Sequence, residues 1–246
     1  MCLGLMQLDK ILQSQGFGNR KACQLLIKQG RIKVNGEICR NANAQIHTEG
    51  LLLTVDQLEL PYHAQVYIAL NKAQGVECSQ NPQRHRSVFD LFPYHLRTRG
   101  LQSVGRLDQD STGLLLLTDD GKYLHALTHP RKHVPKRYWI TTARPITAAQ
   151  IAALSQGVAL NGETGVFAAD QIEQHDEHQL SFTIHQGIYH QVKRMLAAVG
   201  NHVEALERTQ IGNLRLQPLD LAPNEWCYLT AEQVAQAAQS GDGLDL

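Results

Sequence analysis

Residues 105–121 read GRLDQDSTGLLLLTDDG, a polar loop that leads into an apolar run of strand length. Asp108 lies inside the loop, two residues after Arg106. Gly105 and Gly113 allow sharp backbone turns at the two ends, because glycine adopts positive φ without a steric penalty. A carboxylate held at the mouth of a rigid sheet can act as a nucleophile or base. For an isolated aspartate, however, capping a loop is the more common role.

Around this loop the hydrophobic pattern favours an α+β fold. Strands are expected near residues 66–70, 101–104, 114–118, 138–142, 165–173, 179–185 and 202–211, and helices near residues 122–128, 148–154, 190–199 and 231–238. Two of the helices have capping-box starts, at Thr147 with Gln150 and at Thr230 with Gln233. Strands outnumber helices and do not alternate with them, which predicts a mixed or antiparallel sheet with flanking helices.

The first 60 residues form a separate pattern, followed by a linker at residues 61–65 and a second domain over residues 66–246. Leu8, Ile11 and Leu12 share one helical face, and Asn19 is placed to cap a second helix that stops at Gly30. In that second helix we expect an apolar stripe of Ala22, Leu25 and Leu26 opposite a polar face of Arg20, Gln24 and Lys28. Asn35-Gly36 then predicts a tight hairpin.

The formal net charge is zero, yet the charges are unevenly distributed along the chain. Residues 10–40 hold seven lysines and arginines against one acid, and residues 84–106 hold five arginines against one aspartate. Residues 131–137 add four basic side chains, whereas residues 161–246 carry twelve acids against four bases. Each basic segment alone is compatible with a solvated surface. Together they predict positive patches to which a polyanion such as RNA can bind.

Three segments resemble one family of RNA-modifying enzymes. The helix, basic helix and hairpin of residues 6–50 resemble the S4 RNA-binding module, and residues 105–121 resemble the motif of pseudouridine synthases that join this module to a catalytic domain. Two later stretches resemble further motifs of that family, Lys136–Ile140 and Gly187–Met195. Ala73 departs from the family, which often has proline there. The form of the last motif resembles the branch that acts on small-subunit rRNA.

This resemblance implies roles for individual residues. Asp108 would be the essential carboxylate, Tyr138 would stack on the target uracil, and Lys193 would pair with Asp108, with Arg194 as a second candidate. Contacts to the flipped nucleotide or to RNA are expected from Arg106, Arg194, Gln191, Lys72, Arg20, Lys21, Lys28 and Arg31. The implied substrate is 16S rRNA or the assembling small subunit, and the implied target is uridine 516.

Isomerisation of uridine to pseudouridine needs no redox step, so we expect no cofactor and no metal. The five cysteines are scattered without a Cys-x-x-Cys pair, which argues against a disulfide framework and a zinc site. His125, His129 and His133 recur every four residues, but Pro130 and Pro135 would interrupt a helix carrying all three.

Location and assembly state are also expectations. No apolar run approaches the roughly 20 residues of a membrane span, and Met1–Leu5 is too short for a signal peptide. We therefore expect a cytoplasmic protein, monomeric and without a protein partner, whose start is either Met1 or Met6.

Three other functions stay open from the sequence. A synthase of the same family could act on large-subunit 23S rRNA, and a non-catalytic assembly factor could retain the S4 module. A carboxylate-dependent nucleoside or glycoside hydrolase could use Asp108 with Asp110, although two residues of spacing do not fix a carboxylate pair.

Overall fold

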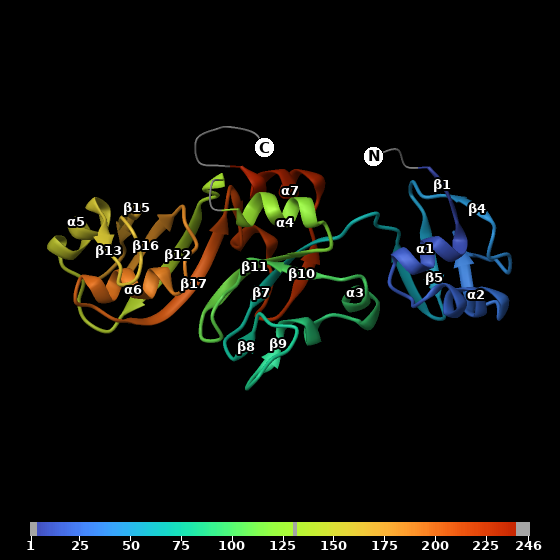
Figure 1. Cartoon of the computed structure of the whole chain (residues 1–246), viewed down its shortest axis with the longest axis horizontal. Coiled ribbons are helices and arrows are strands. Elements are labelled where there is room, and N and C mark those ends of the chain that lie inside the picture. Colours follow the sequence, from blue (N-terminus) through green and yellow to red (C-terminus); the bar gives the residue numbers. More distant parts are fainter. Residues whose placement is uncertain (1–3, 130–131, 240–246) are drawn as a thin grey trace. The chain divides into compact units, whose positions relative to one another are not determined.

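The computed structural model describes residues 4–129 and 132–239 of the 246-residue chain. These residues form two compact units (Figure 1). The first runs to Val66 and includes Phe92–Leu101, and the second holds Tyr67–Leu91 and the chain from Gln102 onward. The expectations on Cys2, on Pro130, on Arg131 and on the start at Met1 lie outside the described residues.

The first unit begins with two short helices and continues into small antiparallel sheets. Its elements are β1 (Leu5–Gln7), α1 (Leu8–Ser14), α2 (Arg20–Lys28), β2 (Ile32–Val34), β3 (Glu37–Ile38), β4 (Gln45–His47), β5 (Leu52–Val55) and β6 (Leu58–Pro61). β1 pairs with β4, and the other four strands are ordered β3-β2-β5-β6. At the predicted hairpin, Asn35 and Gly36 both have positive φ, of 49° and 90°, as a tight two-residue turn requires.

The core of the first unit confirms one predicted helical face and corrects the other. Leu8, Ile11 and Leu12 of α1 are completely buried, as expected. In α2 the buried residues are Cys23 and Ile27, one turn apart, whereas Leu25 is 55% exposed. The expected stripe of Ala22, Leu25 and Leu26 was therefore wrong by about one position around the helix. The Asn19 cap is confirmed, since its Oδ1 accepts a hydrogen bond from the Ala22 amide.

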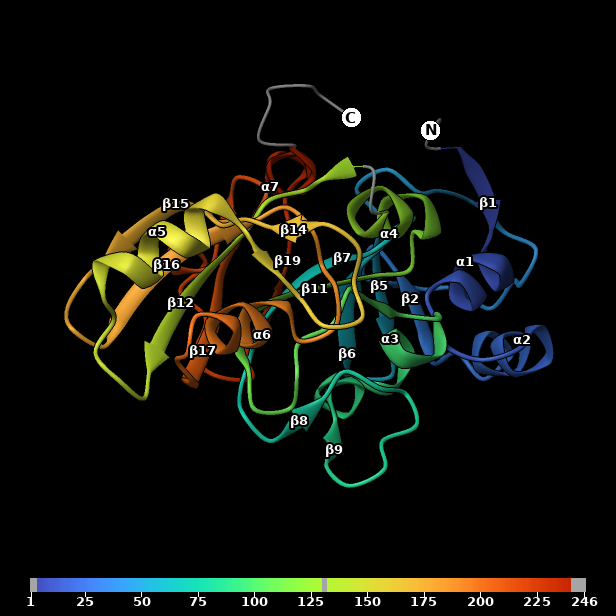
Figure 2. The same cartoon turned by 60° about the vertical axis from the view of Figure 1, so that its left-hand side comes forward.

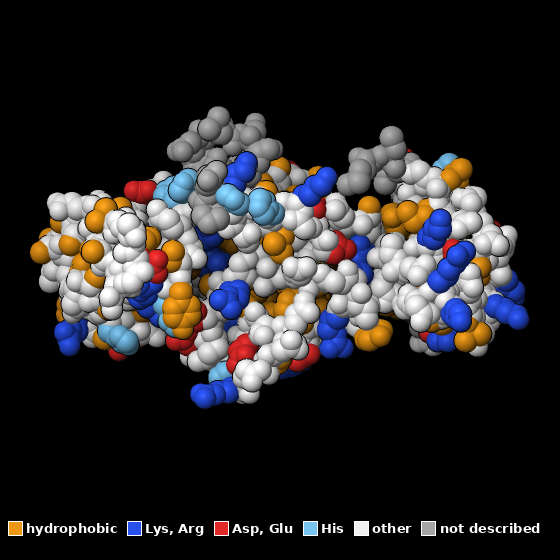
Figure 3. All heavy atoms as spheres, in the orientation of Figure 1, with side chains coloured by type: hydrophobic (Ala, Val, Ile, Leu, Met, Phe, Trp, Pro, Cys, Tyr) orange, Lys and Arg blue, Asp and Glu red, His pale blue; other side chains and the backbone are white. Residues whose placement is uncertain are grey.

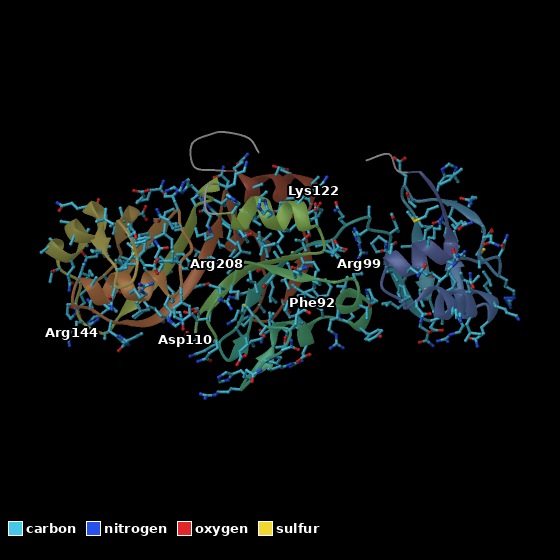
Figure 4. All side chains as sticks on the ribbon, viewed as in Figure 1. Phe92, Arg99, Asp110, Lys122, Arg144 and Arg208 are labelled. Atoms are coloured by element: carbon cyan, nitrogen blue, oxygen red, sulfur yellow. The ribbon has the colours of Figure 1, made fainter. Side chains whose placement is uncertain are left out.

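A segment from the middle of the sequence completes the first unit. It contains α3 (Tyr94–Thr98), which the hydrophobic pattern did not reveal. The His95 ring stacks on Phe17 at 5.3 Å, and the Thr98 hydroxyl donates to the carbonyl of Gly16. Arg99 donates to the side chain of Gln15 and to the His63 carbonyl (labelled in Figure 4). These contacts tie residues 92–101 to the end of α1.

The second unit is built on a mixed sheet of nine strands within the described residues. The main path runs β15-β16-β12-β17-β11-β7-β19, with β10 paired to β11 and β18 paired to β17. These strands are β7 (Tyr67–Lys72), β10 (Gln102–Val104), β11 (Thr112–Thr118), β12 (Lys136–Thr142), β15 (Asp170–Gln174), β16 (Gln179–Ile184), β17 (Val203–Ile211), β18 (Leu214–Arg215) and β19 (Trp226–Tyr228). β11 and β17 run parallel, and the other pairs of this sheet are antiparallel.

Helices cover the sheet in two groups (Figure 2). α5 (Ala148–Gln156) packs against β15 and α6 (Gln191–Ala198) against β17. α4 (Gly121–Thr128) packs on β10 and β11 and contacts α7 (Ala231–Ala238), which packs against β18. Both predicted capping boxes, at the starts of α5 and α7, are confirmed. The predicted α+β class with a mixed sheet is confirmed as well. Among the described residues, no helix is both long and apolar enough to span a bilayer.

Short elements outside the main sheet account for the remaining differences from the prediction. The strand expected at residues 165–173 is two strands, β14 (Val166–Phe167) and β15, which pair with different neighbours. β14 pairs with β13 (Val158–Ala159). The other elements are β8 (Val76–Glu77), β9 (Arg86–Ser87), η1 (Val88–Leu91) and η3 (Gln217–Leu219).

Gly113 sits where β11 meets the parallel strand β17. Its φ is 97°, and an added Cβ would lie 2.4 Å from the carbonyl oxygen of Arg208 and 2.9 Å from the Arg208 nitrogen. Since both neighbours are backbone atoms of a central strand, neither can move away cheaply. The glycine expected to permit a turn therefore also permits the close approach of two strands.

We predict that Gly113→Ala lowers the free energy of unfolding by at least about 2 kcal/mol, because it adds strain and a clash at once. Gly121→Ala is the matched control, since a Cβ there meets no atom within 4 Å. Thermal unfolding of the full chain compares the two variants. Equal melting temperatures would contradict the inference that Gly113 permits the close approach of β11 and β17.

Candidate active site

The loop between β10 and β11 is folded around one buried ammonium group. Lys72, the last residue of β7, is 0% exposed. Its Nζ donates to the carbonyls of Ser111 at 2.7 Å, Asp108 at 2.9 Å and Ala73 at 3.0 Å, with a longer contact to Gln109 at 3.4 Å. The loop that carries Asp108 is thus fixed from inside. Gly105 and Gly113 have positive φ at its two ends, as predicted.

Lys72 was expected to contact the nucleotide or RNA, and the structure corrects this. A fully buried ammonium cannot reach a phosphate in solvent, and its hydrogen bonds all go to backbone carbonyls. Burial lowers the pKa of Lys72 below its usual value, against the opposing effects of Cys78, Asp110 and Asp108. Lys72 is therefore a residue that positions the loop.

Asp108 has a basic partner at each carboxylate oxygen. Lys193 Nζ donates to Oδ2 at 3.0 Å, and His190 Nε2 lies 3.2 Å from Oδ1. The Asp108 side chain is 30% exposed, so it faces solvent in part and is open to a substrate. The structure contains the predicted pair of Asp108 and Lys193. The contact between His190 and Asp108 was not predicted.

Lys193 lies in the first turns of α6 and bridges two carboxylates. Besides Asp108, its Nζ donates to Asp110 Oδ1 at 2.7 Å. Burial would lower the pKa of Lys193, but its hydrogen bonds with Asp110 and Asp108 outweigh burial and raise it. Burial likewise opposes ionisation of Asp110, yet the hydrogen bond from Lys193 lowers the pKa of that carboxyl below its usual value. The bridge therefore holds a charged lysine beside Asp108 across the neutral range.

Arg194, the second candidate partner of Asp108, points to a different loop. Its Nη1 donates to Glu163 Oε1 at 3.0 Å and to the Tyr189 carbonyl at 3.2 Å, and its Nη2 donates to the Asn161 carbonyl. Successive residues of a helix diverge by about 100°, so Lys193 and Arg194 cannot both face Asp108. The structure therefore decides between the two cations in favour of Lys193.

A cavity of about 610 Å³ opens beside Asp108. Its walls come from the Asp108 loop, from β12, from the β16–α6 connection and from β17. Tyr138 of β12 lines it and is only 7% exposed, with Leu206 and Ile184 as apolar neighbours in the wall. Arg106 and Gln191 also line the cavity. The structure thus brings Asp108, Tyr138 and Lys193 to one site, as the sequence predicted.

Gln191 is 3% exposed, and its amide is largely used inside the protein. Its Oε1 accepts from the Ile188 amide, and its Nε2 contacts Gln186 Oε1 at 3.3 Å. These contacts hold the turn that leads into α6. Arg106, in contrast, is exposed at the cavity edge and is the better placed of the two for a substrate contact.

Arg208 is a site residue that the sequence analysis missed (labelled in Figure 4). It lies opposite Tyr138 in the register of β17 with β12, lines the cavity and is 2% exposed. Its Nε donates to the Leu114 carbonyl at 2.8 Å, while its buried Nη2 has no hydrogen-bond partner among the described residues. Its position gave a usable signal. Arg208 comes two residues after Leu206 and so lies on the same face of the strand, and an arginine on a buried face needs a polar partner.

The four basic residues expected to bind RNA from the first unit differ in their surroundings. Arg20 donates to the buried carboxylate of Asp9 at 2.9 Å, and Arg31 forms two hydrogen bonds with Asp56. Lys21 and Lys28 are exposed on α2. Figure 3 shows Lys and Arg side chains over the first unit. Lys21 and Lys28 are therefore the better candidates for phosphate contacts.

We searched the described residues for side chains that together could bind a metal ion. Over residues 4–129 and 132–239, no cluster of three or more His, Cys, Asp or Glu side chains could hold a metal ion. The rings of His125, in α4, and His129, just after it, have centroids 4.8 Å apart and planes tilted by 55°, and Figure 3 shows histidines gathered over this helix. α4 ends at Thr128, and His133 has a positive φ of 49°, so the three histidines do not share one helix.

Comparison with known proteins agrees with this geometry. Residues 66–198 match the family described as RNA pseudouridylate synthase. The chain belongs to this family of pseudouridine synthases. Residues 6–51 match the S4 domain, so the predicted combination of an S4 module with a synthase domain is confirmed.

Related synthases are similar over nearly their whole length. The ribosomal small subunit pseudouridine synthase A of Haemophilus influenzae is 37% identical over 229 residues, which cover 93% of this chain and 98% of that protein. The protein of the same name from Escherichia coli K12 is 38% identical over 230 residues, covering 94% and 99%. A crystal structure of a pseudouridylate synthase, 36% identical, gives a TM-score of 0.66 over 94% of this chain and 99% of that chain.

Lys136 makes the free energy of unfolding of this synthase depend on pH. It lines the cavity, donates to the Val134 carbonyl at 2.9 Å, and has a pKa lowered to about 8 by burial, with a contribution from Arg208. An unfolded lysine has a pKa of about 10.4, so between these values the unfolded state binds more protons and stability rises with pH.

We therefore predict that the unfolding free energy of the wild type, relative to Lys136→Met, rises by about 2–3 kcal/mol between pH 7 and pH 10. Urea unfolding at each pH measures the difference. Lys122→Met is the control, because Lys122 is an exposed lysine of α4 (Figure 4) and its replacement should give no such trend. If the difference in unfolding free energy between wild type and Lys136→Met did not change with pH, the pKa of Lys136 would not be lowered by burial.

Proposed function

We propose that the protein isomerises one uridine of bacterial 16S rRNA to pseudouridine, with uridine 516 as the target and Asp108 as nucleophile or base. The observation that carries the proposal is the Asp108–Lys193 pair beside a cavity lined by Tyr138. The names of the relatives from Haemophilus influenzae and Escherichia coli, similar over almost their whole length, support the small ribosomal subunit as substrate.

The reaction breaks the bond between uracil N1 and ribose C1′, turns the base, and joins C5 to C1′. The C5 proton leaves to solvent and N1 gains a proton, so atoms and electrons balance without an added reactant. Asp108 must be ionised to act as a nucleophile or base. Lys193 lies 3.0 Å from it, and hydrogen bonds with Asp110 and Asp108 raise the pKa of Lys193, so the lysine beside Asp108 is charged.

The target base must leave the RNA stack to reach Asp108. Flipping a base costs a few kcal/mol, which stacking on an aromatic ring and contacts to phosphate can offset. The cavity of about 610 Å³ lies within the usual range of small-molecule sites, about 300–1,000 Å³. Tyr138 supplies the ring, and Arg106, exposed at the edge, supplies a cation.

The S4 module contributes affinity for the RNA backbone. Lys21 and Lys28 are seven residues apart on α2, so they lie on the same side of the helix. Arg20 and Arg31 are engaged by Asp9 and Asp56 and contribute less positive charge to RNA. The substrate is an rRNA or an assembling subunit, and we place the enzyme in the cytoplasm as a monomer.

We predict that Asp108→Asn abolishes pseudouridine formation while RNA affinity changes by no more than a few-fold. Asparagine has nearly the same shape but cannot act as nucleophile or base. Release of tritium from RNA labelled at uridine C5 measures turnover, and filter binding measures affinity. Mapping pseudouridine in rRNA from cells with and without the gene identifies the target.

Asp110→Asn is the matched comparison, because it removes the other carboxylate on Lys193 and leaves Asp108 in place. It should retain turnover, reduced by about tenfold at most, the effect of one weakened ion pair. Retained turnover in Asp108→Asn would overturn the assignment of the catalytic group. Release of free uracil by the wild type would favour a hydrolase instead.

For the S4 module, we predict that the double variant Lys21→Gln with Lys28→Gln weakens RNA binding and reduces its salt dependence. Each phosphate contact contributes about 0.7–0.9 to the slope of log K against log salt, so the slope should fall by about 1–2. Lys122→Gln, an exposed lysine of the other unit, is the control. An unchanged slope in the double variant would show that α2 does not contact the RNA backbone.

A further inference from the structure

Two stacked aromatic rings stand beside Asp108 and have no role in the chemistry described so far. Tyr189 and His190 lie in the turn before α6, with ring centroids 3.8 Å apart and planes 18° apart. Both residues line the cavity that contains Asp108. Tyr189 is nevertheless 69% exposed. Since one face of its ring is covered by His190, the exposed area includes the opposite face.

The pair is held rigidly from both sides. His190 has a left-handed backbone, with φ of 52° and ψ of 32°, and its Nε2 lies 3.2 Å from Asp108 Oδ1. A non-glycine residue stays in this region only where its surroundings hold it there, and such residues cluster at functional sites. The Tyr189 carbonyl accepts from Arg194 Nη1 at 3.2 Å, and the same nitrogen pairs with Glu163. Arg194 thus fixes the backbone of the pair.

A flat, rigid and exposed ring next to cations suits a nucleobase. Every base has a π-face, so an aromatic side chain can bind one without reading its sequence. Arg106 is exposed, lines the same cavity and can attract a phosphate beside such a base. Inside the cavity the target base stacks on Tyr138, which is 7% exposed. The more exposed ring of Tyr189 is therefore available to a different nucleotide.

We propose that Tyr189 and His190 form a stacking platform for the RNA base next to the target uridine, at the exposed edge of the cavity that receives the flipped base. The inference rests on the proposed function, because it needs an RNA substrate whose target uridine enters the cavity. A base stacked on Tyr189 restricts the motion of the Tyr189 and His190 rings, and the imidazole of His190 contacts Asp108. Binding of the flanking nucleotide therefore also steadies the carboxylate.

The test uses the full chain carrying Asp108→Asn, so that RNA binds without turnover. The probe is a hairpin fragment of 16S rRNA that wild-type enzyme modifies, with 2-aminopurine placed on the 5′ or the 3′ side of the target uridine. Stacking on Tyr189 should quench the 2-aminopurine fluorescence at one of these two positions. Tyr189→Phe should preserve the quenching, because phenylalanine keeps the ring.

Tyr189→Leu should lose the quenching and bind the hairpin about tenfold more weakly, within the range seen when one stacking ring is removed. In the background with Asp108 intact, the same change should raise KM more than it lowers kcat. Tyr94→Leu is the matched control, since Tyr94 is 67% exposed and lies in the other unit. It should leave the quenching at that position intact. A melting temperature for each variant separates loss of the ring from loss of the fold.

Quenching and affinity that are unchanged in Tyr189→Leu would overturn the platform, even if the wild type forms pseudouridine normally. A wild type that modifies no uridine in any 16S fragment would instead overturn the proposed function. The two failures are therefore distinguishable.

Discussion

The geometry of the active site depends on a single buried cation. Lys72 is the last residue of β7, and its ammonium donates to the carbonyls of Asp108 and Ser111 in the loop between β10 and β11. A polar loop cannot hold its shape beside an apolar sheet unless its backbone groups find partners. Here one lysine satisfies several carbonyls at once, and Gly113 lets the following strand approach β17 closely. With the loop fixed in this way, Asp108 needs only Lys193 to complete a charged pair at the mouth of the cavity.

Most of the fold was predictable because its main strands and helices carry periodic apolar residues and capping signals. α7 was predicted with its observed bounds, and β11, β12 and β16 were placed to within two residues. The misses are short elements whose stability comes from distant partners. α3 has five residues and is held by contacts with the end of α1, and the three residues of β19 pair with β7. No local pattern encodes such contacts, because their partners lie far away in the sequence.

The site residues were predictable where one motif supplied both the residue and its role. They were less predictable where the role depends on which way a side chain points in the folded chain. Asp108 and Lys193 meet although 85 residues separate them, which the family resemblance implied and spacing alone could not show. Whether Lys72 faced RNA or the interior could not be read from the sequence, since a lysine at a strand end is usually exposed. Arg208 was missed because it is in a strand without a recognised motif. The His190 contact depends on a left-handed residue at the start of α6, which only coordinates reveal.

The assignment of α3 to the first unit has a consequence for synthesis of the chain. Residues 92–101 reach the module only after strands β7 to β9 of the other unit have been made. A ribosome produces the chain from its N-terminus, and early domains begin to fold while later ones are still absent. Phe17 and the end of α1 must therefore wait, without their stacking and hydrogen-bonding partners, until about residue 99 has left the exit tunnel. The RNA-binding module is therefore completed only after β7, the first strand of the catalytic sheet, has been made.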